Sequence, residues 1–193
     1  MTKKTKERIL EAAGKLMANR GFHAVSVKDI AEEANVSEMT VFRHFQTKLG
    51  ILQSLIKVHS YIPYFEQFFS QALTANIVEN LLQIANKYLD FMEKNKVIFL
   101  IAVQDRETIP ELTEFISEDN TKQLQNLLSH YLQQKVEDGT LRLLDTQNAA
   151  IMFLTGLFGF FVSTTIAHNH FLHDQRQSFI HHHVELFLNG AKK

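Results

Sequence analysis

The stretch "NVSEMTVFRHFQTK", residues 35–48, decides how the first part of this chain folds. It places several hydrogen-bonding side chains around an apolar pair, Val41 and Phe45. Ser37 stands where a helix N-cap is expected, because its hydroxyl can accept a hydrogen bond from the first turn. Val36 and Val41 lie on either side of this cap, at the two positions of a hydrophobic staple. The stretch therefore predicts a short helix that begins after Ser37 and ends near Phe45.

The residues before this stretch repeat the same signals. Ser26 can cap a preceding helix, and Asp29, three residues later, completes an approximate capping box. That helix is expected to stop at Asn35, since asparagine tolerates the left-handed backbone conformation better than most residues. Two capped helix starts on either side of a tight turn are typical of a helix-turn-helix.

The rest of the chain also has helical patterns. Apolar residues follow helical spacing in the opening segment, which Gly21 ends. Thr47 is expected to cap a connecting helix that runs to about Ile62 and is interrupted at Pro63. Further helices are expected over residues 77–93, 96–106, 110–138, 149–166 and 174–188. We therefore predict an all-α fold with two domains, a small helix-turn-helix domain over residues 1–47 and a larger helical domain over residues 48–193.

Composition narrows the classes of protein to which the chain can belong. The 193 residues are 45% hydrophobic and include no cysteine, which excludes disulfide scaffolds and thiolate metal sites and fits the cytoplasm. The basic, amphipathic start lacks the features of a signal peptide. Residues 1–50 hold nine Lys or Arg against six Asp or Glu, although the whole chain has a formal net charge of −1. A basic beginning joined to an acidic body suggests that the first part acts near a polyanion.

One uncharged segment leaves two alternatives open. Residues 149–166, "AAIMFLTGLFGFFVSTTI", reach the length of a membrane-spanning helix. However, no cluster of Lys or Arg flanks them to set an orientation in a membrane. A helix that is apolar on all sides is also typical of the centre of a large bundle or of a dimer interface. We favour the buried helix and expect no membrane partner.

The helix that begins after Ser37 has two distinct faces. At 100° per residue, Val41 and Phe45 share the face that would pack on the other helices of the domain. Four polar residues fall on or beside the opposite face: Ser37, Thr40, Arg43 and His44. Arginine can bind guanine with two hydrogen bonds, and threonine can contact a base edge or a thymine methyl group. We interpret this as a DNA-reading helix, with an ordinary solvated helix as the alternative.

Residues 8–52, "RILEAAGKLMANRGFHAVSVKDIAEEANVSEMTVFRHFQTKLGIL", closely resemble the N-terminal domain of TetR-family transcriptional regulators. The later stretch "GTLRLLDTQNAAIMFLTGLFG" loosely resembles the start of the family's penultimate helix. The resemblance implies that double-stranded DNA is a partner. The resemblance and the place of Arg43 on the polar face together give the expected DNA-binding residues: Ser26, Lys28, Ser37, Met39, Thr40, Phe42, Arg43, His44 and Lys48. Two residues depart from the family pattern: Phe42 stands where tyrosine is usual, and Asn35 where glycine is common.

The resemblance also implies a homodimer whose last two long helices form a four-helix interface with those of the partner. The interface residues expected on that basis are Gly156, Gly159, Ser163, Ile180, Val184, Phe187 and Leu188. It further implies a repressor that releases a palindromic operator when a small apolar or aromatic effector binds in the helical body. The sixteen phenylalanines of the chain could line that pocket or simply build core. Candidate pocket residues are Phe65, Phe91, Phe99, Gln104, Phe115, Thr155, Thr164 and His168.

The histidines and the absence of catalytic motifs bear on whether the chain is a metallo-hydrolase or another kind of enzyme. His168, His170 and His173 are spaced like part of a metallo-hydrolase motif, but Leu172 stands where its carboxylate should be. Solvated or interfacial histidines are the alternative, in which case protonation could loosen a dimer. No phosphate-binding glycine loop, nucleophile elbow or spaced carboxylate pair occurs. We therefore expect no enzyme activity, no catalytic residues, no metal and no cofactor.

Overall fold

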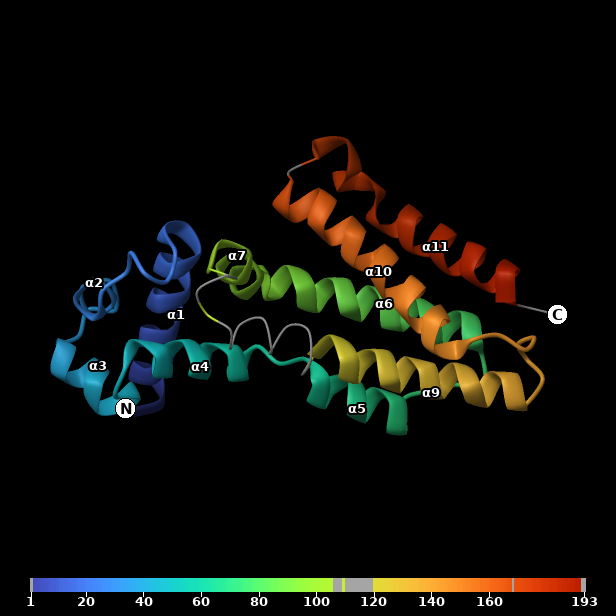
Figure 1. The fold of residues 1–193 in the computed structure, drawn as a ribbon, viewed down its shortest axis with the longest axis horizontal. Helices are drawn as coiled ribbons and strands as arrows, with labels where there is room; N and C mark the ends of the chain where they lie inside the picture. Colours follow the sequence, from blue (N-terminus) through green and yellow to red (C-terminus); the bar gives the residue numbers. More distant parts are fainter. Residues whose placement is uncertain (1, 106–108, 110–119, 168, 192–193) are drawn as a thin grey trace. The chain divides into compact units, whose positions relative to one another are not determined.

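A computed structural model describes residues 2–105, 109, 120–167 and 169–191, and all regular secondary structure in these ranges is helical (Figure 1). The predicted all-α fold is therefore confirmed for this part of the chain. Two compact units are present, each described separately below. The first comprises Met1–Ser60 with Asn95–Ile116, and the second comprises Tyr61–Lys94 with Ser117–Lys193.

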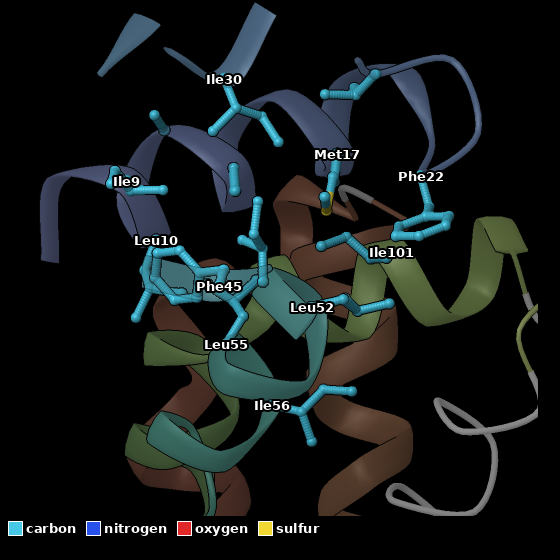
Figure 2. Close-up of a cluster of buried hydrophobic side chains, with 14 of the residues drawn as sticks. Ile9, Leu10, Met17, Phe22, Ile30, Phe45, Leu52, Leu55, Ile56 and Ile101 are labelled. Carbon is cyan, nitrogen blue, oxygen red and sulfur yellow. The ribbon is translucent and has the colours of Figure 1, made fainter. Parts of the chain in front are cut away.

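The first unit is built around its N-terminal helix. It contains α1 (Thr2–Arg20), α2 (Val27–Glu33), α3 (Glu38–Phe45), α4 (Lys48–Val58) and α7 (Lys96–Asp105). Helix α1 packs against α2, α4 and α7, while α3 packs against α2 and α4. Their apolar faces meet in one core, labelled in Figure 2: Ile9, Leu10, Met17, Phe22, Ile30, Phe45, Leu52, Leu55, Ile56 and Ile101. Burial of these side chains is the main force that holds the short α2 and α3 in place.

The caps predicted from sequence are present in this unit. The Ser26 hydroxyl accepts from the Asp29 amide at 3.0 Å, and the Asp29 carboxylate accepts from the Ser26 amide at 2.8 Å. Ser37 and Thr47 cap α3 and α4 by accepting from the amides of Thr40 and Gly50, without the reciprocal bond seen at Ser26. Between α2 and α3, Asn35 adopts the expected left-handed conformation with φ 51°. The predicted helix-turn-helix is confirmed.

The second unit is a bundle of longer helices. It contains α5 (Ile62–Gln71), α6 (Ile77–Lys94), α9 (Gln123–Glu137), α10 (Thr146–Phe161), a π-helical turn (Val162–Ile166), a 3-10 helix (His170–Gln175) and α11 (Arg176–Ala191). Helix α10 packs against α9, α6 and α11, and α11 also packs against α6 (Figure 1). Helix α5 packs against α9.

Several helix boundaries differ from those predicted; for example, α10 begins at Thr146 and not at residue 149. The connecting helix ends at Val58, and Pro63 lies in the first turn of α5, where its missing amide hydrogen is not needed. The aromatic run that follows Pro63 is therefore helical. Helix α11 begins only after the 3-10 helix and continues past Gly190 to Ala191. Of the helix predicted over residues 110–138, the part before residue 120 lies outside the described residues.

A fully buried asparagine joins α6 to α9 within the second unit. Asn80 is 0% exposed, and its carbonyl oxygen accepts from the Thr74 amide at 2.9 Å and the Thr74 hydroxyl at 3.2 Å. Its side-chain amide donates to the Thr74 carbonyl at 2.9 Å and to the Tyr131 hydroxyl at 2.8 Å. Both ends of the amide are thus satisfied, which is what makes a buried asparagine tolerable.

Helices α10 and α11 meet at a glycine covered by a histidine ring. A Cβ added at Gly156 would lie 2.5 Å from the His183 Cε1 atom, so only glycine leaves room for the ring. The His183 Nε2 atom donates to the Phe153 carbonyl at 2.9 Å, which fixes the neutral tautomer with its hydrogen on Nε2. The His183 ring also stacks on Phe179, with centroids 5.5 Å apart.

This packing makes the stability of the second unit depend on pH. Burial lowers the pKa of His183 below its ordinary value, with the Phe153 carbonyl opposing part of that shift. The unfolded chain therefore binds a proton at His183 more readily than the folded protein does. The stabilisation by the neutral His183 ring is complete above about pH 6.5, and it is lost as the pH falls toward the folded-state pKa. We expect the unfolding midpoint of wild type to fall more steeply below pH 6.5 than that of His183→Gln, whose amide does not titrate. Parallel slopes in thermal unfolding across pH 5–8 would contradict this.

The segment Thr146–Ile166 is long and apolar enough to cross a membrane by length and composition. That test alone carries little weight, because the core helix of a soluble protein also passes it. Here Phe153, Leu157 and Phe161 are at most 2% exposed within the unit. The segment thus serves as a core helix along one face.

Candidate nucleic-acid interface

Helix α3 presents the two faces expected of a reading helix. Val41 and Phe45 are 1% and 6% exposed and belong to the core of the first unit. On the other side, Met39 is 75% exposed and Phe42 is 44% exposed. Ser37 and Arg43 are also exposed, whereas Thr40 and His44 are half-buried. The fold thus brings most of the predicted DNA-binding residues of this helix to one surface.

The polar residues at the start of α3 are already joined to each other. The Ser37 hydroxyl oxygen accepts from the Thr40 amide at 3.2 Å and lies 2.9 Å from the Thr40 hydroxyl. Capping of the helix thus fixes the Ser37 rotamer and, through it, the position of the Thr40 hydroxyl. Two hydroxyls held in one geometry form a preorganised contact for a phosphate or a base edge.

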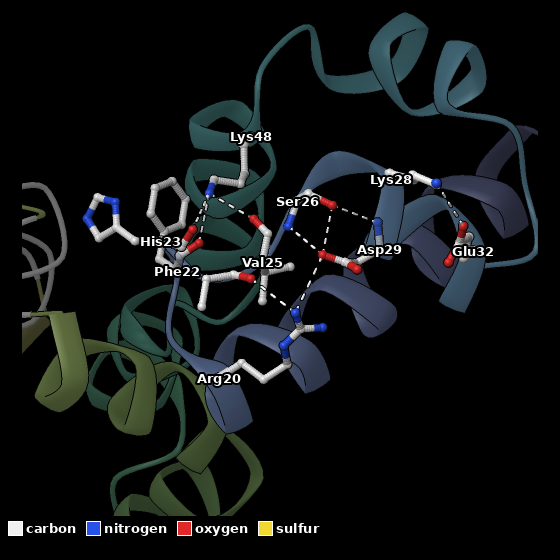
Figure 3. Close-up of polar contacts among 10 residues, drawn as sticks. Arg20, Phe22, His23, Val25, Ser26, Lys28, Asp29, Glu32 and Lys48 are labelled. Carbon is white, nitrogen blue, oxygen red and sulfur yellow. Dashed lines mark hydrogen bonds and ion pairs between the residues drawn. The ribbon is translucent and has the colours of Figure 1, made fainter.

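The start of α2 is similarly ordered (Figure 3). The Ser26 hydroxyl donates to the Asp29 carboxylate at 2.7 Å while it accepts from the Asp29 amide. The hydrogen bond from the Ser26 amide, followed by that from the hydroxyl, lowers the pKa of Asp29 and keeps it charged. Lys28 is exposed, and its ammonium lies 4.0 Å from the Glu32 carboxylate. Lys28 therefore remains at the surface, within reach of a phosphate.

Lys48, which the resemblance implied to meet DNA, lies against the loop before α2. Its ammonium donates to the carbonyls of Phe22 and Val25, each at 2.8 Å (Figure 3). It also lies 4.4 Å from the centroid of the Phe22 ring. The carbonyls of the loop before α2 supply acceptors for the ammonium, so in this structure Lys48 ties the start of α4 to that loop.

The expected effector residues are distributed over both units. Phe65 on α5 is fully buried and its ring lies 6.0 Å from that of Phe91 on α6, so these two are brought together. Phe99 lies on α7 in the first unit. On α10 and the π-helical turn after it, Thr155 is exposed, while the buried Thr164 donates its hydroxyl to the Phe160 carbonyl at 2.9 Å. The side chain of Gln104, together with Phe115 and His168, lies outside the described residues.

Sequence reasoning missed an aromatic cluster that surrounds Tyr61. Rings of Phe65, Tyr88 and Phe91 lie 5.9, 6.2 and 6.2 Å from the Tyr61 ring. Burial raises the pKa of Tyr61 to about 12 and that of Tyr88 further, so both phenols are neutral hydrogen-bonding groups. The sequence signal for this cluster was the aromatic run "YIPYFEQFF" at residues 61–69. Pro63 lies in this run, and the run had therefore been interpreted as the place where a helix is interrupted.

The expected dimer residues fall into two groups. Ile180, Val184 and Leu188 are at most 2% exposed within a single chain, so the core of their own unit already uses them. Gly156 faces His183, and the Phe187 ring lies 5.1 Å from that of Phe153. By contrast, a Cβ at Gly159 would meet nothing within 4 Å, and Ser163 is half-buried. Exposed apolar side chains that had not been singled out lie on these helices: Ile151, Met152 and Leu186.

A metal site is absent from the described residues, in which no group of three or more His, Asp or Glu could hold an ion. His168 and the side chains of His170 and His173 lie outside these residues. The metallo-hydrolase alternative therefore receives no support from the structure.

Two family profiles match the chain. One, described as bacterial regulatory proteins of the TetR family, matches residues 9–55. The other, described as the C-terminal domain of AefR-like transcriptional repressors, matches residues 79–190. The first profile covers the helix-turn-helix, and the second covers most of the helical body.

Individual proteins agree with these profiles. The regulator YvkB of Bacillus subtilis is 27% identical over 186 residues, which is 96% of each chain. The crystal structure of FadR from Bacillus subtilis in complex with stearoyl-CoA superposes with a TM-score of 0.72, at 23% identity over 95% of this chain and 98% of that one. SmeT in complex with triclosan gives a TM-score of 0.75, at 18% identity over 98% of this chain and 92% of that one. The chain belongs to the TetR family of DNA-binding transcriptional regulators, which are not enzymes.

Proposed function

We propose that this protein is a homodimeric repressor that binds a palindromic operator through α3 and releases it when a small apolar or aromatic effector binds. The observation that carries the DNA-binding part is the division of α3, whose Val41 and Phe45 are buried while Met39, Phe42 and Arg43 face solvent. A helix anchored on one side and exposed on the other can enter the major groove and read bases. In this proposal residues 1–47 bind DNA, residues 48–193 dimerise and bind effector, and the protein acts in the cytoplasm.

The exposed apolar side of α10 and α11 supports the dimer. Met152 and Leu186 are 71% and 72% exposed, and Ile151 is 42% exposed. Only 44% of the most apolar 18-residue window of Thr146–Ile166 is buried within the chain. A second copy related by a two-fold axis would cover the same residues on both protomers. We propose that these side chains, with Gly159 and Ser163, form the interface in place of Ile180, Val184 and Leu188.

The aromatic cluster around Tyr61 supports an apolar effector. Its rings are uncharged, and its phenols stay neutral over the physiological pH range. Aromatic surroundings of this kind favour ligands that are mostly apolar with one or two hydrogen-bonding atoms. Two structural relatives were solved in complex with stearoyl-CoA, which has a long apolar acyl chain, and with the aromatic compound triclosan. Release of the operator then follows if effector and DNA favour different spacings of the two α3 helices in the dimer.

Selection from a random DNA pool tests the DNA-reading function. We expect enrichment of a palindrome whose half-sites lie about one helical turn apart, with affinity that falls steeply as salt rises. Arg43→Ala should relax the base preference at one position of each half-site and weaken the selected site by about tenfold. Lys57→Ala removes an exposed cation from α4 and serves as the control with unchanged preference. Recovery of no preferred sequence by the effector-free protein would contradict the proposal.

A further inference from the structure

The turn between α2 and α3 is held by an arginine from another helix. Arg8, on α1, donates from its Nη2 atom to the carbonyls of Ala34 and of Asn35, the latter at 3.0 Å. The two carbonyls belong to the C-cap residue that follows α2 and to the next residue of the turn, 26 and 27 residues along the chain from Arg8. A single guanidinium nitrogen thus bridges the end of one helix and the residue that redirects the chain into the next.

This contact completes the hydrogen bonding of the turn. The amides of Asn35 and Val36 donate back to the carbonyls of Glu32 and Ala31, at 3.0 and 2.9 Å. Those bonds satisfy the turn's donors, and the carbonyls of Ala34 and Asn35 accept from Arg8. Carbonyls at a helix C-terminus carry the negative end of the helix dipole, and a cation there is favourable. Arg8 supplies that cation.

The position of α3 depends directly on this turn. Asn35 has φ 51°, in the left-handed region, and only Val36 separates it from Ser37, the N-cap of α3. A rotation of the peptide between Ala34 and Asn35 would therefore tilt α3 and move the side chains at its start. The buried pair Val41 and Phe45 fixes the far part of the helix, whereas Arg8 fixes its entry.

We propose that Arg8 is a positioning residue for operator reading: it orients α3 through the α2–α3 turn and does not itself bind phosphate. The inference rests on the DNA-reading function proposed above. A phosphate contact by Arg8 is the competing role, because the residue is exposed and carries a full positive charge. The two roles differ in their salt dependence. Loss of a phosphate contact reduces the slope of log affinity against log salt by about one, while loss of orientation leaves the slope unchanged.

The test compares wild type with Arg8→Gln, Arg8→Lys and, as a control for net charge, Lys57→Gln. Binding to the selected operator and to unrelated DNA is measured across salt concentrations at 20 °C, with thermal unfolding of each variant alongside. We expect Arg8→Gln to weaken operator binding about tenfold, to weaken unrelated DNA much less, and to keep the wild-type salt slope. The ammonium of Arg8→Lys can reach the same carbonyls. This variant should therefore recover part of the ratio between the affinity for the operator and the affinity for unrelated DNA.

Three outcomes would overturn the inference. A salt slope lowered by about one, with both DNAs weakened alike, would make Arg8 a phosphate contact. If Arg8→Gln lowers the unfolding temperature but leaves the ratio between the affinities for operator and unrelated DNA unchanged, the role of Arg8 is structural only. Binding that matches Lys57→Gln throughout would leave Arg8 without a specific role. If wild type itself selects no operator, the DNA-reading function fails first, which is a different result from failure of Arg8→Gln alone.

Discussion

Replacing Asn80 with alanine is expected to lower the free energy of unfolding by about 3 kcal/mol. The substitution removes four hydrogen bonds at once, two made by each end of the side-chain amide. It leaves the hydroxyl of the buried Tyr131 without this donor, whereas the groups of the exposed Thr74 can turn to water. Tyr131 is only 2% exposed, so little water can replace the lost hydrogen bond to its hydroxyl. Urea denaturation followed by circular dichroism measures the loss.

The matched control for this change is Asn126→Ala. Asn126 is exposed and is the fourth residue of α9, as Asn80 is the fourth residue of α6, so alanine there gains the same helix propensity without removing a buried amide. We expect the control to stay within about 0.5 kcal/mol of wild type. Equal midpoints and slopes for Asn80→Ala and Asn126→Ala would show that the α6–α9 contact does not depend on the asparagine.

Replacing Gly156 with alanine is expected to destabilise the second unit by about 2 kcal/mol, although alanine is the better helix former. The new methyl would occupy the space of the His183 ring, with the nearest ring atom 2.5 Å away. To relieve this overlap the ring must leave its stacking on Phe179 and its hydrogen bond to Phe153. Chemical denaturation of Gly156→Ala measures the result.

A double-mutant cycle with His183→Ala isolates the contact. Once the ring is removed, Gly156→Ala should no longer destabilise and should show the gain of about 1 kcal/mol expected for glycine to alanine inside a helix. A loss of the same size with and without His183 would mean that the glycine is needed for something other than the ring.

The parts of the fold that sequence predicted correctly depend on neighbours within a few residues. Ser26, Ser37 and Thr47 cap their helices through amides only three residues ahead, and Asn35 turns the chain through its own φ angle. Such signals are complete within a short stretch of chain. The two faces of α3 likewise follow from helical spacing alone.

The parts that sequence did not predict depend on which distant segment lies alongside. Ile180, Val184 and Leu188 form an apolar stripe on α11 that looks the same whether its own chain or a partner covers it, and here the chain itself covers it. The direction of the Lys48 side chain depends on carbonyls more than twenty residues away. Pro63 was read as an interruption because proline permits both a helix start and a helix end.

The hydrogen-bond acceptors of Arg8 have a kinetic consequence. The Arg8 guanidinium donates to backbone carbonyls, which are neutral, so this ordered cation keeps its whole charge. Carboxylate partners would fix the same geometry but would cancel the field at a distance. Unneutralised charge attracts a polyanion before any contact forms and raises the rate of encounter, an effect that salt suppresses. The bonds that order the N-terminal unit thus leave intact the long-range attraction that speeds its approach to DNA.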